Sequence, residues 1–428
     1  MLAPLAAAAP GRSVRYALLA AITLCACRAP GPVAVERAER AARAKGDVVI
    51  AAVWPWAQQR AVHFGDGLRM ALDEVNATGG VDGRHVRVVR FDDQASVDKG
   101  RLVAEQIGAD PNVVAVIGHL QSYVSVPAAA IYDLTGLVMI SPAATDPQLT
   151  SQGYRRVFRT TFTDRSVGRR MADFAMHQGY HRIAICYIRD TYGRDLANAF
   201  EERATEIRLT VVARQSYDAS GEVSDHTFEP VFRDWKGTAI DAIFLAGEVP
   251  SAAQFIAQAR HAGIVAPIIG GDALNSGVLM QLAGAAAEGT VVPSVFHFDE
   301  PGAEARHFTA AFSARFGTPP DAGAALGYDA LRILVDAMRR AHSTVPDSVA
   351  RTLHEMRDWR GATGTLSFDS AGNLVHQQVV TMVVRNGQFD LLGERVVAAV
   401  PAPETAKGAH PVAAAGAKGV GIAGGSRQ

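Results

Sequence analysis

Two segments place small and hydroxyl-bearing residues directly after an apolar run of the strand type. The first reads VIGHLQS and ends at Ser122, and the second reads MISPAATDP and contains Thr145. Where a buried parallel strand gives way to a helix, the first amides of that helix have no backbone partner, and the helix dipole favours negative charge. The two segments therefore predict a site for an anion, and a carboxylate ligand would suit it.

The sequence patterns of the common enzyme classes are missing from the chain. It contains no GxxxxGK[ST] loop, no GxGxxG loop after a strand and no HExxH helix, and no GxSxG turn accompanies His119. We therefore interpret His119 as a structural histidine. Only three cysteines occur, and Cys186 lies in the apolar run RIAICYI, which leaves no cysteine-based metal site. We expect no catalytic residue, no metal and no cofactor.

The composition is that of a folded protein with more than one domain. Of the 428 residues, 48% are hydrophobic and 20% are charged, a balance that excludes a largely disordered chain. With 42 basic and 43 acidic residues the net charge is -1, so no overall field attracts nucleic acid. Arg37, Arg40 and Arg43 alternate with Glu36 and Glu39, which we interpret as a solvated helical face.

The N-terminus has the features of an export signal. Two arginines precede the apolar run 16–26, which is too short to span a membrane. The run ends in LCAC, which resembles the lipobox of bacterial lipoproteins with Cys27 as the lipidated residue. An ordinary signal peptide is the alternative, and both interpretations place the protein outside the cytoplasmic membrane. We expect a signal peptide over 1–26 and a lipid-anchored tether without a fold of its own over 27–45.

Between the two ends of the chain, apolar runs such as 47–53 and 182–188 alternate with helical patterns. Continuous apolar strands predict parallel sheets that are covered by helices on both faces. The alternation occurs in two series, so the predicted fold is α/β with two doubly wound parallel-sheet lobes. The late segments are expected to complete these lobes, because a lone hairpin is not stable. The expected boundaries are 46–162 plus 295–364 for lobe 1, 163–294 plus 365–398 for lobe 2, and 399–428 for a disordered tail.

Several motifs resemble those of the periplasmic leucine/isoleucine/valine-binding proteins of ABC transporters. They are, in chain order, GDG at 65–67, the turn NATGGVDGR, FDD at 91–93, IGH, SPAATDPQLT, TYG at 191–193 and GD at 271–272. Each is weak alone, but their order over residues 46–392 is typical of that family. The resemblance implies the type I periplasmic binding fold, in which three hinge crossovers join two lobes that enclose the ligand. We expect the crossovers near 160–164, 292–296 and 364–368.

The same resemblance implies roles for residues at the motifs. Ser122 matches the hydroxyl that holds the α-carboxylate of an amino acid, with help from the backbone at Ala143 and Ala144. Thr145 matches the residue that bridges the carboxylate and the amine of the ligand. Asp272 matches the acidic partner of the α-ammonium group, a role that suits a carboxylate because a desolvated cation needs an opposite charge.

Further residues are expected at the ligand cleft. Tyr192 matches a second-lobe aromatic residue that caps the ligand on closure. Trp54 and Trp56 could line the side-chain pocket or serve local packing. Glu248 departs from the family, because branched-chain binders usually carry an aromatic residue there. A carboxylate is unfavourable beside an aliphatic side chain unless it is paired. Either the ligand carries a polar or cationic group, or Glu248 shares the ammonium with Asp272.

These observations together predict an extracytoplasmic solute-binding lipoprotein that captures an amino acid or a similar small amphoteric ligand. The expected partners are that ligand, the membrane through the lipid on Cys27, and the permease subunits of an ABC transporter. We expect a monomer that binds no nucleic acid. The alternatives are a ligand-sensing regulatory lipoprotein with the same fold, and a binder of urea, an amide or another carboxylate. An enzyme is disfavoured because the catalytic motifs are missing.

Overall fold

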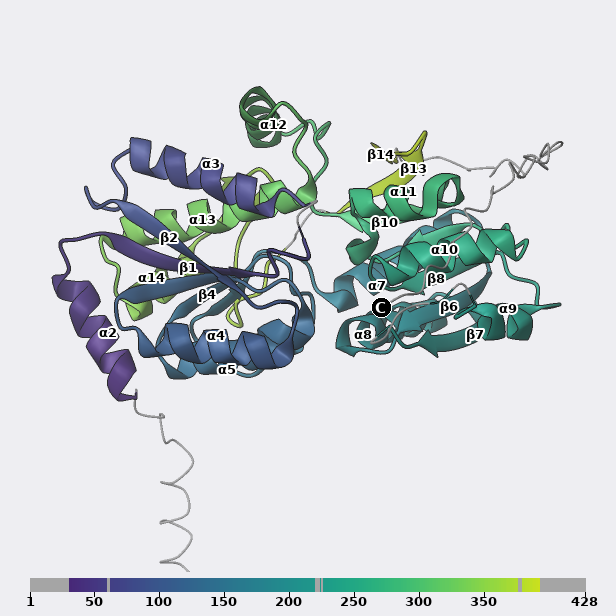
Figure 1. The fold of residues 1–428 in the computed structure, drawn as a ribbon, viewed down its shortest axis with the longest axis horizontal. Helices are drawn as coiled ribbons and strands as arrows, with labels where there is room; N and C mark the ends of the chain where they lie inside the picture. The colour runs from purple at the N-terminus through teal and green to yellow at the C-terminus, as the bar shows by residue number, and fades with distance from the viewer. Residues whose placement is uncertain (1–30, 60–61, 220–223, 225, 376–378, 393–428) are drawn as a thin grey trace, which may run out of the picture.

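The computed structural model describes residues 31–59, 62–219, 224, 226–375 and 379–392. Within these residues the chain forms two bodies, each with a sheet between helices (Figure 1). None of the described helices has the length and apolar character that a membrane span requires. The expected signal peptide, the lipidation site Cys27 and the expected tail over 399–428 lie outside the described residues.

The sheet of lobe 1 is parallel throughout, with the strand order β2-β1-β3-β4-β5. Its central strands are buried at every position, as expected for strands covered by helices on both faces. The strands are β1 (Val48–Trp54), β2 (Val86–Asp92), β3 (Val113–Gly118), β4 (Val138–Ser141) and β5 (Val157–Arg159).

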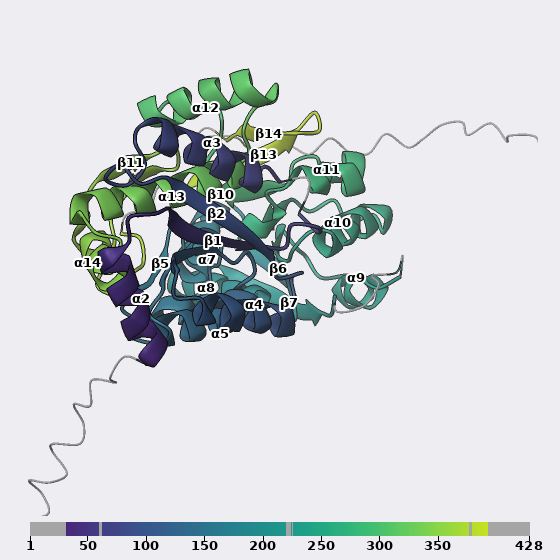
Figure 2. The same cartoon turned by 60° about the vertical axis from the view of Figure 1, so that its left-hand side comes forward.

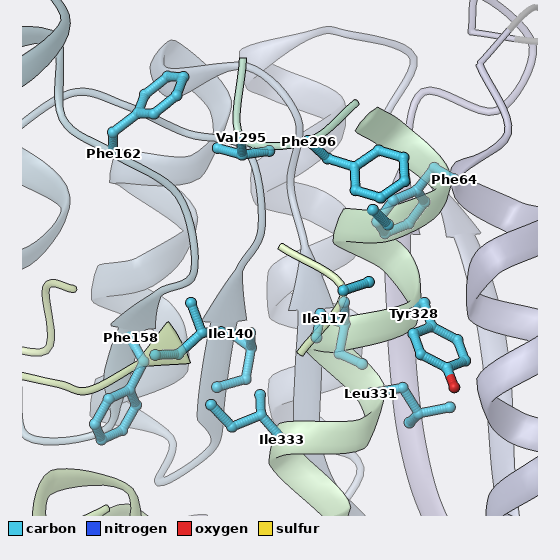
Figure 3. Packing of buried hydrophobic residues seen from close by; sticks show 14 of the residues in the cluster. Phe64, Ile117, Ile140, Phe158, Phe162, Val295, Phe296, Tyr328, Leu331 and Ile333 are labelled. Carbon is cyan, nitrogen blue, oxygen red and sulfur yellow. The ribbon is translucent and has the colours of Figure 1, made fainter. Parts of the chain in front are cut away.

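Helices cover both faces of this sheet (Figure 1). One face carries α3 (Phe64–Ala77) and α13 (Ala322–Ala341), and the other carries α4 (Val97–Ala109) and α5 (Ser122–Leu134). Figure 3 shows Leu331 and Ile333 of α13 packed toward Ile117 and Ile140 of the sheet. The lobe also contains α6 (Gln148–Ser151), α12 (Ala303–Phe316), α14 (Pro346–Glu355) and a hairpin of β11 (Trp359–Gly361) and β12 (Gly364–Leu366).

The sheet of lobe 2 has the strand order β14-β13-β10-β9-β8-β6-β7. Only the β10–β13 and β13–β14 pairs are antiparallel among the described strand pairs of this sheet. The strands are β6 (Arg182–Ile188), β7 (Thr210–Tyr217), β8 (Ala242–Ala246), β9 (Ile268–Gly270), β10 (Val291–Ser294), β13 (Val380–Arg385) and β14 (Gln388–Leu391).

Helices on the two faces of the second sheet belong to different core clusters. The helices α7 (Asp164–His177) and α8 (Thr191–Glu206) pack on one face, and α9 (Glu229–Trp235), α10 (Ser251–His261) and α11 (Gly277–Ala283) lie together on the other (Figure 2). The short 3-10 helices η1 (Asp272–Leu274) and η2 (Gly284–Ala287) complete the lobe. The prediction of an α/β fold with two doubly wound lobes is therefore confirmed, with an antiparallel edge added to the second sheet.

The chain passes between the lobes three times within or beside the described residues. The first passage joins β5 to α7, and the second joins β10 to α12. The third lies later than the expected 364–368, because residues 367–375 stay on lobe 1. There the Arg159 amide donates to the Gly372 carbonyl, and Phe368 packs edge-on against Phe158. The passage to β13 therefore follows residue 375, and this corrects the expected boundary between the two lobes.

The stretch expected as a tether over 27–45, with a weakly helical charged part, contains the helix α2 (Pro32–Arg43), which packs against lobe 1. Arg37 is fully buried on its inner face. The guanidinium of Arg37 donates to the backbone carbonyl groups of Gly108, Asp110, Val113 and Thr135. The interpretation of a solvated face is therefore wrong for Arg37, since the planar guanidinium satisfies carbonyls that the ends of α4 and α5 leave unpaired. Arg40 and Arg43 do lie exposed.

Candidate ligand-binding site

A cleft between the lobes has a cavity volume of about 170 Å³. The carboxyl ends of the central strands of both sheets border it, which is where open α/β sheets place their ligands. Most of the site residues expected from the sequence line this cleft: Trp54, Ser122, Ala143, Thr145, Tyr192, Glu248 and Asp272. The remaining one, Ala144, is buried outside it, and its carbonyl accepts a hydrogen bond of 3.0 Å from the Arg159 guanidinium.

Lobe 1 contributes hydrogen-bond donors to the cleft. Ser122 is the first residue of α5, so its side chain lies beside the unpaired first amides of that helix. The amides of Thr145 and Asp146 each donate to the Ser122 hydroxyl oxygen over 3.2 Å. This hydroxyl therefore links the two segments in which the sequence predicts an anion site. The positive end of the helix dipole and the hydroxyl both favour a carboxylate here.

The loop after β4 connects the cleft to the first passage between the lobes. Ala143 is half-buried and lines the cleft, whereas Thr145 is only 2% exposed. The Thr145 carbonyl accepts a hydrogen bond of 2.9 Å from the amide of Asp164, the first residue of α7. A ligand that contacts Thr145 therefore touches a residue that is hydrogen-bonded to the start of α7, where the first passage between the lobes ends.

Lobe 2 contributes an acidic group held by a tyrosine. The Tyr192 hydroxyl donates to Asp272 Oδ1 over 3.0 Å and accepts from the Ala273 amide over 3.2 Å. Burial raises the pKa of Asp272 to about 6, although the hydrogen bond from Tyr192 opposes this shift. Burial, followed by the charge of Asp272, raises the pKa of Tyr192 well above its usual range. Tyr192 therefore stays protonated and orients a carboxylate that a cation would stabilise.

Glu248 follows β8 and occupies the same wall of the cleft as Asp272. Burial raises the pKa of Glu248 to about 8, and the charges of Asp190 and Asp272 add to the effect. Asp190 ends the turn after β6, and its carboxylate caps α8 by accepting from the Gly193 amide over 2.7 Å. Three neighbouring strands of lobe 2 are thus each followed by an acidic residue.

Trp54 ends β1 and is only 2% exposed at the cleft wall. Its ring stacks on Phe64 at a centroid distance of 3.9 Å and an interplanar angle of 8°. Trp54 therefore lines the cleft and also packs in the core. Trp56 is not among the residues that line the cleft, and its indole donates to the Phe91 carbonyl over 2.9 Å. The rest of the apolar lining includes residues that the sequence did not indicate, such as Val62 and Leu326. They come from segments far apart in the chain, and a helical pattern alone does not show which turn of α13 reaches the cleft.

His119 is not part of the cleft chemistry. It is fully buried, with Nδ1 2.6 Å from Asp93 Oδ2 and Nε2 3.0 Å from the Tyr132 hydroxyl. Both ring nitrogens are engaged, which confirms the interpretation of a structural histidine. Within the part of the chain that the structure describes, no group of three or more potential ligands could hold a metal ion.

Comparison with known proteins identifies the family. The profile of the periplasmic binding protein family matches residues 60–388. This chain belongs to that family. The leucine-specific-binding protein of Salmonella typhimurium is 30% identical to this periplasmic binding protein over 342 residues, which are 80% of this chain and 90% of that one. The family resemblance drawn from the motifs is therefore confirmed.

Solved structures agree with the fold of this periplasmic binding protein. An ABC transporter substrate-binding protein from Desulfitobacterium hafniense is 36% identical, covers 81% of this chain and 100% of its own, and gives a TM-score of 0.73. A leucine binding protein from Thermotoga maritima is 28% identical, covers 81% of this chain and 98% of its own, and gives a TM-score of 0.75. The fold is shared along almost the whole length of these two neighbours, which are a substrate-binding protein and a leucine binding protein.

Proposed function

We propose that this periplasmic binding protein captures an amino acid between its lobes and presents it to the permease of an ABC transporter. The observation that carries the proposal is the opposite character of the two cleft walls. Lobe 1 offers the Ser122 hydroxyl and the N-terminus of α5, and lobe 2 offers the carboxylate of Asp272. A small molecule with a carboxylate at one point and an ammonium at another matches both walls. Relatives named for leucine, isoleucine and valine binding support the same ligand class.

In this proposal each charged end of the ligand has its own partners. The α-carboxylate lies at Ser122 and Thr145, where hydroxyl groups and helix amides donate to it. The α-ammonium faces Asp272, which Tyr192 holds in place. Since the partners come from different lobes, the bound ligand favours the closed arrangement over the open one. The protein releases the solute unchanged, and the closed form is the one that the permease recognises.

The first experiment identifies the ligand. Small molecules released by denaturing the purified protein are analysed by mass spectrometry, and we expect an amino acid in stoichiometric amount. Calorimetry with a panel of amino acids then tests the site through Asp272→Asn. Losing a charged hydrogen bond of about 1.5–3 kcal/mol weakens binding roughly 10- to 100-fold.

A variant of the exposed Asp98, Asp98→Asn, serves as the control and should keep the affinity of the unmodified protein. Tight binding that Asp272→Asn leaves unaltered contradicts the assignment of the site. A protein that releases no amino acid and binds none in the panel contradicts the proposed function itself.

The proposal includes a lipid on Cys27, which anchors the protein to the outer surface of the cytoplasmic membrane or to another extracytoplasmic membrane. We expect Cys27→Ser to move the protein from the membrane fraction to the soluble fraction of the host cell, because the lipid is the proposed membrane attachment. Fractionation followed by intact-mass analysis checks this result. A wild-type mass without added acyl chains argues for an ordinary signal peptide instead.

A further inference from the structure

Lobe 2 places two carboxyl groups in the cleft, whereas an amino acid with an uncharged side chain brings a cation for only one of them. Among the described residues that line the cleft, Glu248 and Asp272 are acidic, and none is lysine, arginine or histidine. An amino acid with an uncharged side chain brings one ammonium group, which can neutralise one of these carboxylates once water is excluded. The other carboxyl group then has no cation beside it. Without one, burial keeps the pKa of Glu248 at about 8, so this group is largely protonated at pH 7, and a second cation on the ligand would stabilise its ionised form.

Negative charge also surrounds this wall from behind. Asp190 follows the strand next to β8, and its charge acts on Glu248. Asp164 is fully buried at the first passage between the lobes, where the charge of Asp272 acts on it. The buried guanidinium of Arg159 opposes these charges from outside the cleft lining, and it donates to backbone carbonyl groups of lobe 1. The wall of lobe 2 therefore favours a ligand with excess positive charge.

The cleft also contains two side-chain atoms that have no hydrogen-bond partner among the described residues. Gln121 lines the cleft and is 9% exposed, and its Oε1 has no hydrogen-bond partner among the described residues. A buried acceptor of this kind costs free energy until a donor reaches it. The indole Nε1 of Trp54 also lacks a partner in the described part of the chain, and this donor suits an oxygen of the ligand carboxylate. A donor on the ligand would therefore satisfy Gln121, in addition to the carboxylate oxygen that suits Trp54.

The remaining lining suits the stem of a long side chain. Val62, Phe162, Val295 and Leu326 give the cleft an apolar surface between its polar groups. Methylene groups pack favourably on such a surface, while a charged end group stays with its partner. The carboxylates of Glu248 and Asp272 follow adjacent strands, and adjacent strands lie about 4.8 Å apart. The two carboxyl groups therefore stand at neighbouring points of the same wall, where one ligand can contact both.

We infer that the cleft selects an α-amino acid whose side chain ends in a positive charge, of the lysine, ornithine or arginine class, with Glu248 as the partner of that second charge. The inference rests on the proposed function, which places the α-carboxylate on lobe 1 and the α-ammonium at Asp272. It differs from a site in which Glu248 and Asp272 share a single ammonium group. In the shared arrangement Glu248 contacts only the α-ammonium, so the contribution of Glu248 to the affinity does not depend on the side chain of the ligand.

Calorimetry at pH 7 with lysine and norleucine tests this difference, since the two ligands share a stem and differ in the terminal ammonium. The full mature protein is first freed of any bound ligand by unfolding and refolding. We expect lysine to bind at least about 10-fold more tightly than norleucine, as one buried charge pair of about 1.5–3 kcal/mol implies. Glu248→Gln should reduce that ratio to near one. The matched control Glu202→Gln, which alters an exposed residue of α8, should leave the ratio unchanged.

Each outcome separates this inference from the proposed function. Norleucine or leucine binding more tightly than lysine, ornithine and arginine overturns the inference and leaves the proposed function standing. Equal loss of lysine and norleucine affinity in Glu248→Gln also overturns it, because Glu248 then serves the α-ammonium. A protein that binds no amino acid of either kind overturns the proposed function, and the inference with it.

Discussion

Glu248 and Asp272 bind protons more tightly in the folded protein than in the unfolded chain. Their pKa values rise from 4.5 to about 8 and from 3.8 to about 6, and burial is the largest cause for both groups. Between the unfolded and folded pKa values the folded state holds more protons, so stability decreases as the pH rises through this window. Asp164, whose pKa burial also raises, acts in the same direction.

We therefore expect the melting temperature of the ligand-free protein to decrease between pH 5 and pH 8. In Glu248→Gln this decrease should be smaller, because the glutamine side chain does not titrate and carries no charge to bury. Melting curves by circular dichroism at several pH values measure the effect. A wild-type slope identical to that of Glu248→Gln would show that Glu248 does not titrate in this range.

The sequence predicted the polar residues of the cleft better than its apolar ones. Ser122 lies in a segment that follows a buried strand, so the strand pattern places it at the carboxyl edge of a sheet, whereas Asp272 is identified through the family resemblance. Val62 and Leu326 reach the cleft through loop geometry and helix rotation, which local patterns do not specify. Ala144, which we expected at the site beside Ala143, is buried outside the cleft lining, because successive residues of this loop face the cleft and the core in turn.

At the scale of elements, α2 depends on one buried cation. Burial lowers the pKa of Arg37 to about 10, so the guanidinium remains charged at neutral pH. It bonds to carbonyl groups at the ends of α4 and α5 and at the start of β3. Arg37 therefore joins three elements of lobe 1 to the N-terminal helix.

Replacing Arg37 by methionine should destabilise the protein by about 2–4 kcal/mol, because several buried carbonyl groups lose their donor. We expect a lower melting temperature and faster trypsin cleavage at the arginines of α2. Arg40→Met is the matched control, since Arg40 is exposed and pairs with Glu36 one turn away. Its effect should stay below about 0.5 kcal/mol. Equal effects of the two substitutions would contradict a structural role for the buried guanidinium.

Most elements of the lobes could be predicted from periodicity, whereas the packing of α2 against lobe 1 could not, for a physical reason. Apolar strands and amphipathic helices have strong local patterns, and these patterns predict most of the elements from β1 to β10. The helix α2 buries two alanines together with Arg37, so its inner face does not look apolar. Only the carbonyl groups of lobe 1 make that arginine a favourable residue to bury, and they are distant in sequence.

At the scale of the whole molecule, the cleft residues belong to two bodies joined by three passages. Asp272 and Glu248 move with lobe 2, whereas Ser122 and Thr145 move with lobe 1. A ligand bonded to both sets favours the arrangement with the lobes closer together. The third passage could not be located from the sequence, because the chain after β12 stays on lobe 1 through backbone hydrogen bonds to residues distant in sequence.

We expect the radius of gyration in small-angle X-ray scattering to decrease when the amino acid recovered from the protein is added in excess. Asp272→Asn should show a smaller decrease at the same ligand concentration, because it weakens the contact of the ligand with lobe 2. An unchanged radius at a saturating concentration, with binding confirmed by calorimetry, would contradict closure as the response to ligand.

The docked helix α2 also limits how far the protein can travel from its membrane. With a lipid on Cys27 as proposed, five residue steps separate the anchor from Pro32, where α2 begins. A fully extended chain spans at most about 3.6 Å per residue, so the stretch from Cys27 to Pro32 spans at most roughly 18 Å. Lobe 1 would therefore remain within about one domain radius of the lipid surface. The anchored protein would then meet a permease of the same membrane by diffusion along the membrane surface, where its local concentration is high.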